Sequence, residues 1–263
     1  MTPADLWEGG DAYERWVGRW SRLVGAEFLA WLHVPRDRLW LDLGCGTGAL
    51  TETVLATAAP ASIIGVDPSD SFVAHARSRV QNPRASFVQG AADAIPLASD
   101  SVEAAVAGLV LNFIPDLDAG LAELRRVVVS GGTIAGYVWD YAGRMQLIRR
   151  FFDAAIELDP AAVEADEGSR FPICAPAPLR AAFEGAGLHA IDVRPIETPT
   201  VFTDFDDYWT PFLSGIGPAA GYAMRLSETD RGRLRERLRA TLPTGEDGSI
   251  HLVARAWSVR AER

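Results

Sequence analysis

The chain has 263 residues, of which 48% are hydrophobic, and its formal net charge at pH 7 is −10. This size and composition predict a single domain, residues 1–263, with a sizeable core. All 25 basic residues are arginine, and an acidic chain without lysine is poorly suited to follow a phosphate backbone. We therefore expect no nucleic-acid partner.

The sequence lacks the usual signals for export, membrane insertion and metal binding. The first eleven residues contain three acids and no basic residue, unlike a signal peptide, and the best apolar run, 104–111, is too short to cross a bilayer. The two cysteines, Cys45 and Cys174, and the four histidines lack the spacing of a disulfide framework or a metal site. We expect a cytoplasmic protein, a monomer or homodimer, that binds no membrane and no metal.

The first predicted element is an aromatic-rich segment, residues 11–32, which reads as one or two helices. Trp16, Trp20 and Leu23 fall at i, i+4 and i+7, so they lie on one helical face. The simplest interpretation is a helix that packs this face on the rest of the domain.

Residues 39–50, with the sequence LWLDLGCGTGAL, predict a strand that turns through Gly44, Gly46 and Gly48 into a helix. Such a turn exposes backbone N–H groups and allows a ligand to approach closely. The spacing also fits the dinucleotide fingerprint G-x-G-x-x-A, with Ala49 in the last place. Glycine spacing alone therefore leaves two cofactor classes open.

Asp42, two residues before the first glycine, helps to separate these classes. Its carboxylate would repel a pyrophosphate but attract a ligand with an ammonium and a sulfonium, such as S-adenosylmethionine. The pattern LDLGCGTG resembles the first motif of class I S-adenosylmethionine-dependent methyltransferases. This resemblance implies cofactor binding by Asp42, Gly44, Cys45 and Gly46.

The same resemblance bears on the N-terminal segment. In related methyltransferases a segment at this place often folds over the cofactor, which implies a helical lid over about residues 1–35. Tyr13 and Arg19 would then reach the methionine carboxylate of the cofactor.

Strand and helix patterns alternate beyond the glycine loop, with strands predicted at 62–66, 85–89, 102–111 and 133–139. This alternation predicts an α/β fold, a Rossmann-like and mostly parallel sheet with helices on both faces. Ligands of such sheets bind beyond the carboxyl ends of the strands.

Asp67 closes the second predicted strand, 23 residues after Gly44. An acid at this position accepts hydrogen bonds from ribose hydroxyls in nucleotide-binding α/β folds. The alternative role is a helix N-cap, but Ser69 and Asp70 already offer that function. Pro68 is then placed to lie flat against the adenine.

Asp93 follows the third predicted strand, in the sequence GAADAIPL. The resemblance expects an acid here that accepts from the adenine 6-amino group, with the backbone of 92–94 meeting the ring edge. Ala92 and Asp93 are therefore predicted cofactor contacts. The acidic turn and strand start at 100–103 agree with this pattern.

The fourth predicted strand ends near Leu109, where the resemblance implies that the backbone holds the amino end of the cofactor. Asn112 either orients the methyl acceptor or caps the turn before Pro115. The sequence LRRVVVSGG at 124–132 matches the motif that follows this helix in the family, with Ser130 where proline is usual.

The second half predicts helices at 140–158 and 177–186 and strands at 189–197 and 249–259. The family expects the seventh and last strand to be antiparallel and inserted beside the fifth. The segment of about 203–242, between the last two strands, is predicted as a helical cap over the acceptor pocket, with ordinary packing of an extra helix pair as the alternative. The candidates for a general base are Asp140 and Tyr141, and the candidate acceptor contacts besides Asn112 are Trp139, Trp209 and Phe212.

The resemblance extends over about residues 13–139 and is strongest to the small-molecule branch that includes ubiquinone and menaquinone biosynthesis methyltransferases. It predicts in-line transfer of a methyl group from S-adenosylmethionine to a small, apolar or aromatic acceptor. Two alternatives remain: a catalytically silent protein that binds S-adenosylmethionine or S-adenosylhomocysteine, and a nicotinamide-dependent oxidoreductase. Asp42 argues against the oxidoreductase, and a Tyr-x-x-x-Lys pair is impossible without lysine.

Overall fold

The computed structural model describes residues 19–215 and 217–263. Their backbone contacts divide the chain into two compact units. The sheet unit consists of Ser21–Val138, Ala175–Ile196 and Trp257–Arg263. The helical unit consists, among the described residues, of 19–20, Trp139–Cys174 and Glu197–Ala256.

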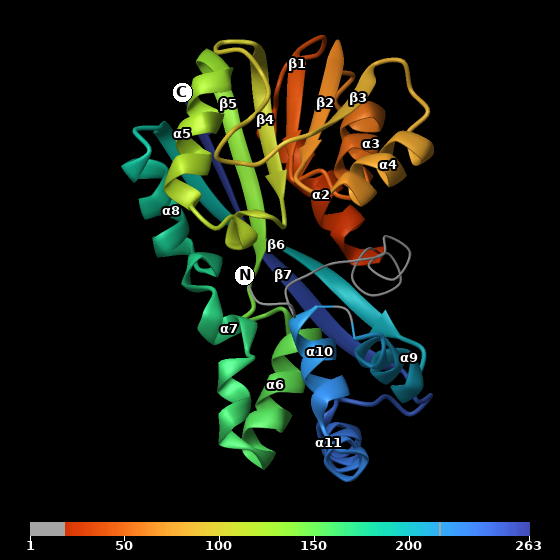
Figure 1. Cartoon of the computed structure of the whole chain (residues 1–263). Helices are drawn as coiled ribbons and strands as arrows, with labels where there is room; N and C mark the ends of the chain where they lie inside the picture. Colours follow the sequence, from red (N-terminus) through yellow and green to blue (C-terminus); the bar gives the residue numbers. More distant parts are fainter. Residues whose placement is uncertain (1–18, 216) are drawn as a thin grey trace. The chain divides into compact units, whose positions relative to one another are not determined.

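Seven strands form one sheet in the order β3-β2-β1-β4-β5-β7-β6 (Figure 1). The strands are β1 (Leu39–Leu43), β2 (Ser62–Asp67), β3 (Ala85–Gln89), β4 (Val102–Gly108), β5 (Val128–Trp139), β6 (His189–Phe202) and β7 (Ile250–Glu262). The five strands from β3 to β5 in this order are parallel neighbours. β6 and β7 are long enough to contribute residues to both units.

The last strand runs antiparallel to β5, as predicted. The N–H of Gly131 donates to the carbonyl of Arg263, and the N–H of Arg263 donates to the carbonyl of Gly132, which joins the start of β5 to the end of β7. At the other end of β5, the N–H of Asp140 donates to the carbonyl of Arg255. The predicted Rossmann-like sheet is therefore confirmed, including the insertion of the last strand beside the fifth.

The central strand β1 is an almost continuous run of large apolar residues, which pack on both faces of the sheet. Trp40, Leu41 and Leu43 are buried, as expected for an inner strand of a parallel sheet. Its register with β2 places Asp42 opposite Gly65. Both strands thus end at the same edge of the sheet, and the glycine loop begins there.

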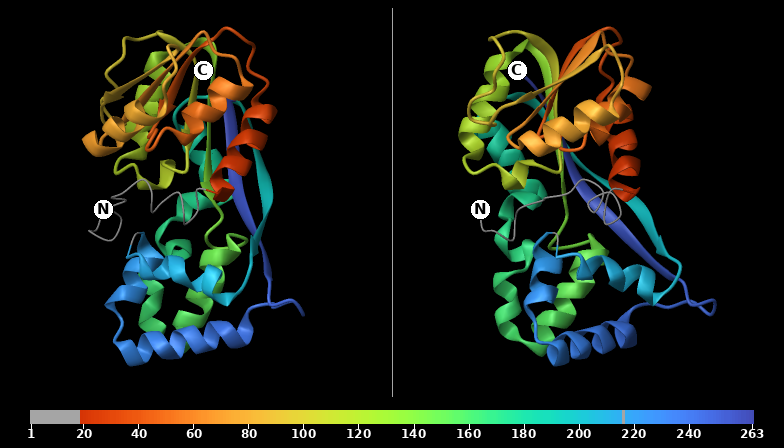
Figure 2. Two further views of the ribbon diagram at one scale, coloured as in Figure 1. Left: turned by 90° about the vertical axis from the view of Figure 1, so that its right-hand side faces the viewer. Right: turned by 45° about the vertical axis from the view of Figure 1, so that its right-hand side comes forward.

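Helices cover both faces of the sheet unit (Figure 1, Figure 2). One face carries α2 (Arg19–Leu32), α3 (Ala49–Thr57) and α4 (Asp70–Arg79), and the other carries α5 (Leu117–Val127) and α8 (Pro176–Gly185). Ser69 is the N-cap of α4, where its hydroxyl accepts from the N–H of Phe72. The predicted alternative role for Asp67, a cap of this helix, is therefore taken by Ser69.

The helical unit is built around an aromatic core. Its helices are α6 (Gln146–Leu158), α7 (Glu167–Arg170), α9 (Phe205–Trp209), α10 (Pro218–Arg225) and α11 (Glu228–Thr241), with short 3₁₀ turns η4 (Pro160–Glu164), η5 (Pro172–Cys174) and η6 (Thr210–Leu213). Phe151 and Phe212 stack with ring centroids 4.4 Å apart. The segment predicted as a cap is helical, and its role over an acceptor stays a prediction.

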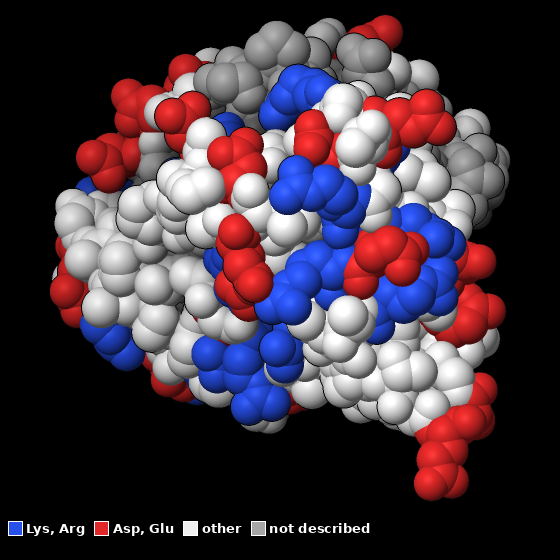
Figure 3. Space-filling model, turned by 90° about the horizontal axis from the view of Figure 1, so that it is seen from below, with Lys and Arg blue, Asp and Glu red and all other residues white. Residues whose placement is uncertain are grey.

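The arginines of α11 lie on a surface where acidic side chains are interleaved with them, as Figure 3 shows from the side of this helix. Arg235 pairs with Asp206, and Arg237 pairs with Glu157. Because the two opposite charges of each exposed pair offset each other, this helix presents a surface of mixed charge rather than a uniform basic stripe.

Several predicted elements differ in their bounds. β5 begins at Val128 rather than at residue 133, and β6 ends at Phe202 rather than at residue 197. β4 ends at Gly108 rather than at Leu111, because Leu109 adopts a left-handed backbone with φ of 59°. α6 begins at Gln146 rather than at Asp140, because the Asp140 carboxylate and carbonyl accept the N–H groups of the following turn. Among the described residues, no helix is both long and apolar enough to cross a membrane.

Candidate functional site

The glycine loop between β1 and α3 turns sharply at two residues that require glycine. Gly44 has φ of 69° and Gly46 has φ of 50°, which lie in the left-handed region that L side chains disfavour. A Cβ on Gly44 would lie 2.4 Å from Cγ2 of Val110, whereas a Cβ on Gly46 would meet no atom within 4 Å. The loop is therefore closed on the side of β4 and open at Gly46.

The N–H groups of this loop are already hydrogen-bonded to the end of β2. Those of Gly44 and Cys45 both donate to the carbonyl of Val66, at 2.7 and 3.1 Å. That of Gly46 donates to Oδ2 of Asp67, at 2.9 Å. A pyrophosphate site of the dinucleotide type needs such N–H groups to point at the ligand. This loop instead presents a carboxylate, which disfavours the nicotinamide alternative.

Asp67 is fixed at the end of β2 by two backbone donors. Besides Gly46, the N–H of Ser69 donates to Oδ1 of Asp67, at 2.9 Å. The residue is 7% exposed, and burial raises the pKa of its carboxyl although both N–H groups oppose this shift. A carboxylate has about four acceptor sites, so Asp67 keeps sites for two further donors such as vicinal hydroxyls.

Asp42 is the most deeply buried acid of the candidate site, with 1% exposure. Its Oδ2 accepts a hydrogen bond from the hydroxyl of Thr51 on α3, at 2.7 Å. Burial raises its pKa to about 7, and the charge of Asp67 adds to this shift against the opposing hydrogen bond. Asp42 therefore changes its charge near neutral pH, and a cationic ligand would favour its ionised form.

Cys45 takes part in the site through its backbone, because its side chain points into the sheet unit. The thiol packs in a cluster with Val73, Val80 and Phe87. Burial raises the pKa of the Cys45 thiol and that of the Cys174 thiol in the helical unit.

Both cysteines are therefore expected to be unreactive in the native protein. Thiol-disulfide reagents attack the thiolate, and these side chains are 6% and 3% exposed. Titration with 5,5′-dithiobis(2-nitrobenzoate) at pH 8 should modify neither cysteine in the native protein and both cysteines in guanidinium chloride. Rapid modification of one native thiol would contradict the packing described here.

The residues predicted to meet the adenine lie after β2 and β3, at the same edge of the sheet. Pro68 is exposed, and its carbonyl accepts from Nε2 of Gln89 at 3.0 Å. Ala92 is half-buried and Asp93 is exposed, on a tight turn closed by a hydrogen bond from Ala94. Asp42 near the end of β1, Asp67 at the end of β2 and Asp93 after β3 thus lie at the carboxyl ends of three neighbouring strands.

The end of β4 supplies two further predicted residues. The N–H of Leu109 donates to the carbonyl of Tyr137 at 2.8 Å, so the predicted contact with the cofactor ammonium falls to the carbonyl of Leu109. Its left-handed backbone is a strained conformation of the kind found at binding sites. In the following turn, η3 (Leu111–Phe113), Nδ2 of Asn112 is buried, and no described residue accepts a hydrogen bond from it. A buried amide N–H group without an acceptor lowers the stability of the protein, unless a ligand accepts its hydrogen bond.

The predicted base Asp140 lies in the helical unit and forms an ion pair with Arg255, a residue 115 positions away in the chain. Nε and Nη2 of Arg255 lie 2.7 and 2.6 Å from Oδ2 of Asp140, which also accepts from the N–H of Arg144. Asp140 and the neighbouring Trp139 and Tyr141 are buried. Asp140 thus has a clear structural role, and its assignment with Tyr141 as a general base stays a prediction.

The remaining predicted residues also belong to the helical unit or lie outside the described chain. Tyr13 is not among the described residues. Arg19 pairs with Asp207 at 3.4 Å, and its guanidinium lies over the ring of Trp20 at 4.1 Å. Trp209 and Phe212 are buried and pack against each other in the aromatic core. Their predicted contact with a methyl acceptor stays a prediction.

Comparison with known proteins agrees with this geometry. Residues 41–136 match the family model described as a methyltransferase domain. The chain is 33% identical over 107 residues to a 2-phytyl-1,4-naphtoquinone methyltransferase of Thermosynechococcus vestitus, covering 40% of this chain and 48% of that protein. It is 30% identical over 158 residues to a trans-aconitate 2-methyltransferase of an Acidovorax species, covering 59% of each chain. The chain therefore spans only about half the length of these curated relatives.

The fold comparison covers more of the chain. The structure of phosphoethanolamine N-methyltransferase 2 from Haemonchus contortus, in complex with S-adenosyl-L-methionine, aligns with a TM-score of 0.60 at 15% identity. The alignment covers 96% of this chain and 56% of that one. At this identity the likeness concerns the fold.

Proposed function

Residues 41–136 belong to the methyltransferase domain family, and on that premise we propose that the protein transfers a methyl group from S-adenosylmethionine to a small molecule. The observation that carries this proposal is the pair of carboxylates, Asp42 and Asp67, at neighbouring strand ends beside a glycine loop. The loop N–H groups are occupied by the protein itself. Such a site suits a cationic nucleoside and not a pyrophosphate.

The residues have separate roles in this proposal. The Asp67 carboxylate accepts the two ribose hydroxyls, and Asp42 offsets the positive charge at the methionine end of the cofactor. The carbonyl of Leu109 receives the cofactor ammonium. Pro68, Ala92 and Asp93 meet the adenine. Gly46, which has open space where a Cβ would lie, leaves room for the cofactor against the loop.

The cofactor supplies an electrophilic methyl group on a sulfonium. In the transfer, a lone pair of the acceptor forms a bond to the methyl carbon while the bond from carbon to sulfur breaks, and its electrons stay on sulfur. The chain contributes by holding the acceptor in line and by excluding water, which lowers the barrier by several kcal/mol. The buried amide of Asn112 donates a hydrogen bond that orients a polar atom of the acceptor.

The acceptor is proposed to be a small molecule with an apolar or aromatic body. The names of both relatives described above support a small acceptor, and that of the naphtoquinone methyltransferase also supports an apolar, aromatic body. A protein that binds the cofactor without transferring its methyl group is the second candidate, because the proposed reaction needs few catalytic side chains. The two candidates differ in turnover and not in cofactor binding.

The proposal is tested by calorimetric titration of the protein with S-adenosylhomocysteine and with NADH. We expect binding of the first ligand only. Asp67→Ala should weaken binding about 100-fold, because two hydrogen bonds to a charged acceptor are lost. Asp70→Ala, which removes an exposed acid from the first turn of α4, is the matched control and should bind as the parent protein does.

The transferase activity itself is tested with radiolabelled S-adenosylmethionine and a panel of phenols, quinols and aliphatic acids. Labelled product that disappears in Asp67→Ala would support transfer. Binding of S-adenosylhomocysteine without product from any acceptor would favour the silent binding protein. Binding of NADH alone would overturn the proposal.

A further inference from the structure

The loop that carries Asp93, residues 90–101, has a few hydrogen bonds of its own, such as that from the N–H of Ala94 to the carbonyl of Ala91, and is held against the sheet unit by helix α5. At its far end, the N–H groups of Asp100 and Ser101 donate to the carbonyls of the last residues of α5. Nearer to Asp93, α5 approaches the loop at Gly120, where a Cβ would lie 3.5 Å from Cβ of Ala92. The helix therefore supports the loop on both sides of the predicted adenine contact.

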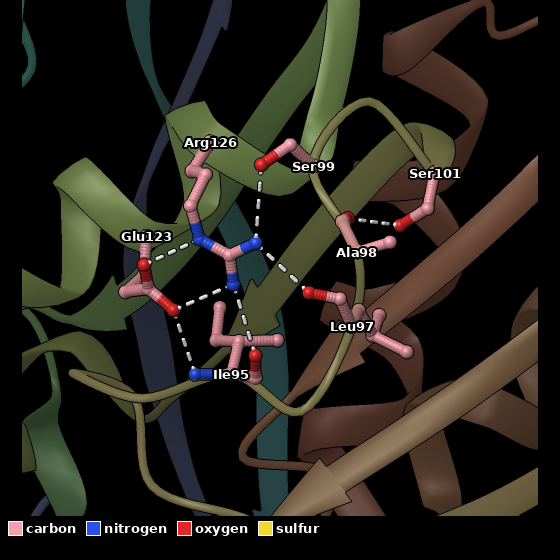
Figure 4. A network of polar contacts seen from close by, with 7 residues as sticks. All are labelled: Ile95, Leu97, Ala98, Ser99, Ser101, Glu123 and Arg126. Atoms are coloured by element: carbon pink, nitrogen blue, oxygen red, sulfur yellow. Dashed lines mark hydrogen bonds and ion pairs between the residues drawn. The ribbon is translucent and has the colours of Figure 1, made fainter.

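Two charged side chains on this face of α5 bind the middle of the loop (Figure 4). Arg126 donates from Nη2 to the carbonyl of Ile95 at 3.0 Å and from Nη1 to the carbonyl of Leu97 at 2.9 Å. Nη1 also contacts the hydroxyl of Ser99 at 3.4 Å. Oε2 of Glu123 accepts from the N–H of Ile95 at 2.9 Å. Both backbone polar groups of Ile95 are thus held by one ion pair.

The ion pair is itself well formed. Nε of Arg126 lies 2.6 Å from Oε1 of Glu123, and Nη2 lies 2.8 Å from Oε2. This parallel, bidentate geometry is the strong form of a hydrogen bond between charged groups. Each partner stabilises the charge of the other, which lowers the pKa of Glu123 and raises the pKa of Arg126.

A purely structural role explains this arrangement less well than a positioning role. The side chains of Arg126 and Glu123 are 35% and 21% exposed, so solvent screens part of the attraction between their charges and reduces its contribution to the free energy of unfolding. The buried side chain of Ile95 already anchors the loop to the core. What the pair adds is a fixed orientation of the backbone two residues after Asp93.

Asp93 needs such external support. It is exposed, and within residues 19–215 and 217–263 no side chain or N–H group donates a hydrogen bond to its carboxylate. Among the described residues, its position is therefore set by the backbone of its turn and by the contacts that hold that backbone. A turn that moves by an ångström would lose the hydrogen bond from a ligand amino group.

We infer that Glu123 and Arg126 are positioning residues that hold the 92–99 backbone so that Asp93 selects the adenine base of the cofactor. The inference rests on the proposed function, because the ligand is the same. It adds that base selectivity, and not only affinity, depends on an ion pair on α5. Neither side chain touches the cofactor.

The experiment compares the affinity for S-adenosylhomocysteine with that for S-inosylhomocysteine, in which a carbonyl oxygen replaces the adenine 6-amino group. The parent protein should prefer the adenine ligand about tenfold, the value of one hydrogen bond to a charged group. Asp93→Ala should remove this preference. Arg126→Met, which keeps the aliphatic stem, should reduce it to less than about threefold, and Arg126→Lys should restore it in part.

Two further variants separate positioning from general loss of structure. Arg77→Met removes an arginine of α4 that binds the backbone carbonyl of Phe87, and it should leave the preference unchanged. The double variant Asp93→Ala with Arg126→Met should show no further loss of preference, because both changes act through the same contact. Hydrogen exchange of the amides at 92–99 should be faster in Arg126→Met, and this readout needs no ligand.

The outcomes distinguish the inference from the proposed function. If the parent protein binds neither ligand, both the proposed function and the inference are overturned. If it binds and prefers the adenine ligand, but Arg126→Met weakens both ligands equally, only the inference is overturned. Unchanged exchange of the 92–99 amides in Arg126→Met would also overturn it.

Discussion

Asp42→Asn is expected to make the protein more stable at pH 8 and to remove most of the dependence of its stability on pH between 4 and 8. In the native protein, burial raises the pKa of Asp42 from 3.8 to about 7. As the pH rises through this interval, the unfolded chain loses the proton first, so the free energy of unfolding falls and then levels off above pH 7. For a fully buried group this shift corresponds to a loss of about 4 kcal/mol.

Asparagine keeps an acceptor for the hydroxyl of Thr51 but carries no charge to bury. Urea unfolding at a series of pH values measures the effect. The raised pKa of Asp67 contributes a slope of the same sign, which should persist in the variant. Asp70→Asn, at an exposed acid, is the matched control and should retain the full slope. A parent protein whose stability does not change between pH 4 and 7 would contradict the prediction.

The protonation of Asp42 should also affect the binding of the cofactor. A cationic ligand favours the ionised form of Asp42, so binding below pH 7 should release a proton. The affinity for S-adenosylmethionine, which carries the sulfonium as well as the ammonium, should then rise by up to about tenfold per pH unit between pH 5 and 7 and stay constant above pH 7. In Asp42→Asn the affinity should be weaker at pH 8 and should vary little with pH. The variant that gains stability is thus expected to lose binding, a conflict common at functional sites.

The fold was predictable because its signals are local in the sequence. The glycine turn at 44–48 and the acid at the end of β2 can be recognised from their spacing in the sequence. The alternation of strand and helix patterns predicts a parallel sheet. The order of the last strands came from the resemblance and was confirmed. The bounds were less accurate where one residue, such as Leu109, departs from the regular backbone.

The missed features are interactions between residues far apart in the chain. Arg255 and Asp140 are 115 positions apart, and nothing in either local sequence indicates that they meet. The Arg126 contacts reach back about 30 positions to a loop that reads as ordinary turn sequence. The raised pKa of Asp42 is likewise a property of burial, which a single sequence does not specify. The sequence predicted where ligand groups would lie, and the structure adds what holds them.

Gly44→Ala is expected to act mainly on stability and Gly46→Ala mainly on cofactor binding, although the two glycines are only two residues apart. At Gly44, the new Cβ would lie 2.4 Å from Val110 and the residue would be held at positive φ. Strain and overpacking together should lower the free energy of unfolding by about 3 kcal/mol. Adding Val110→Ala removes the contacts of Cγ2 and Cγ1 at 2.4 and 2.9 Å but leaves that of Cβ at 2.8 Å, so it should recover only some of the overpacking cost, which thermal or urea unfolding of the double variant would show.

At Gly46, only the backbone strain remains, so Gly46→Ala should cost about 1 kcal/mol of stability. Its Cβ projects into open space on the side where we place the cofactor, and we expect the affinity for S-adenosylhomocysteine to fall at least about tenfold. The two measurements together locate the ligand. If Gly46→Ala bound normally while Gly44→Ala was destabilised as expected, the loop would have its described geometry but the cofactor would lie elsewhere. The loss of stability in Gly44→Ala does not depend on any ligand. It therefore tests the geometry of the loop independently, and the binding measurement on Gly46→Ala then tests where the cofactor lies.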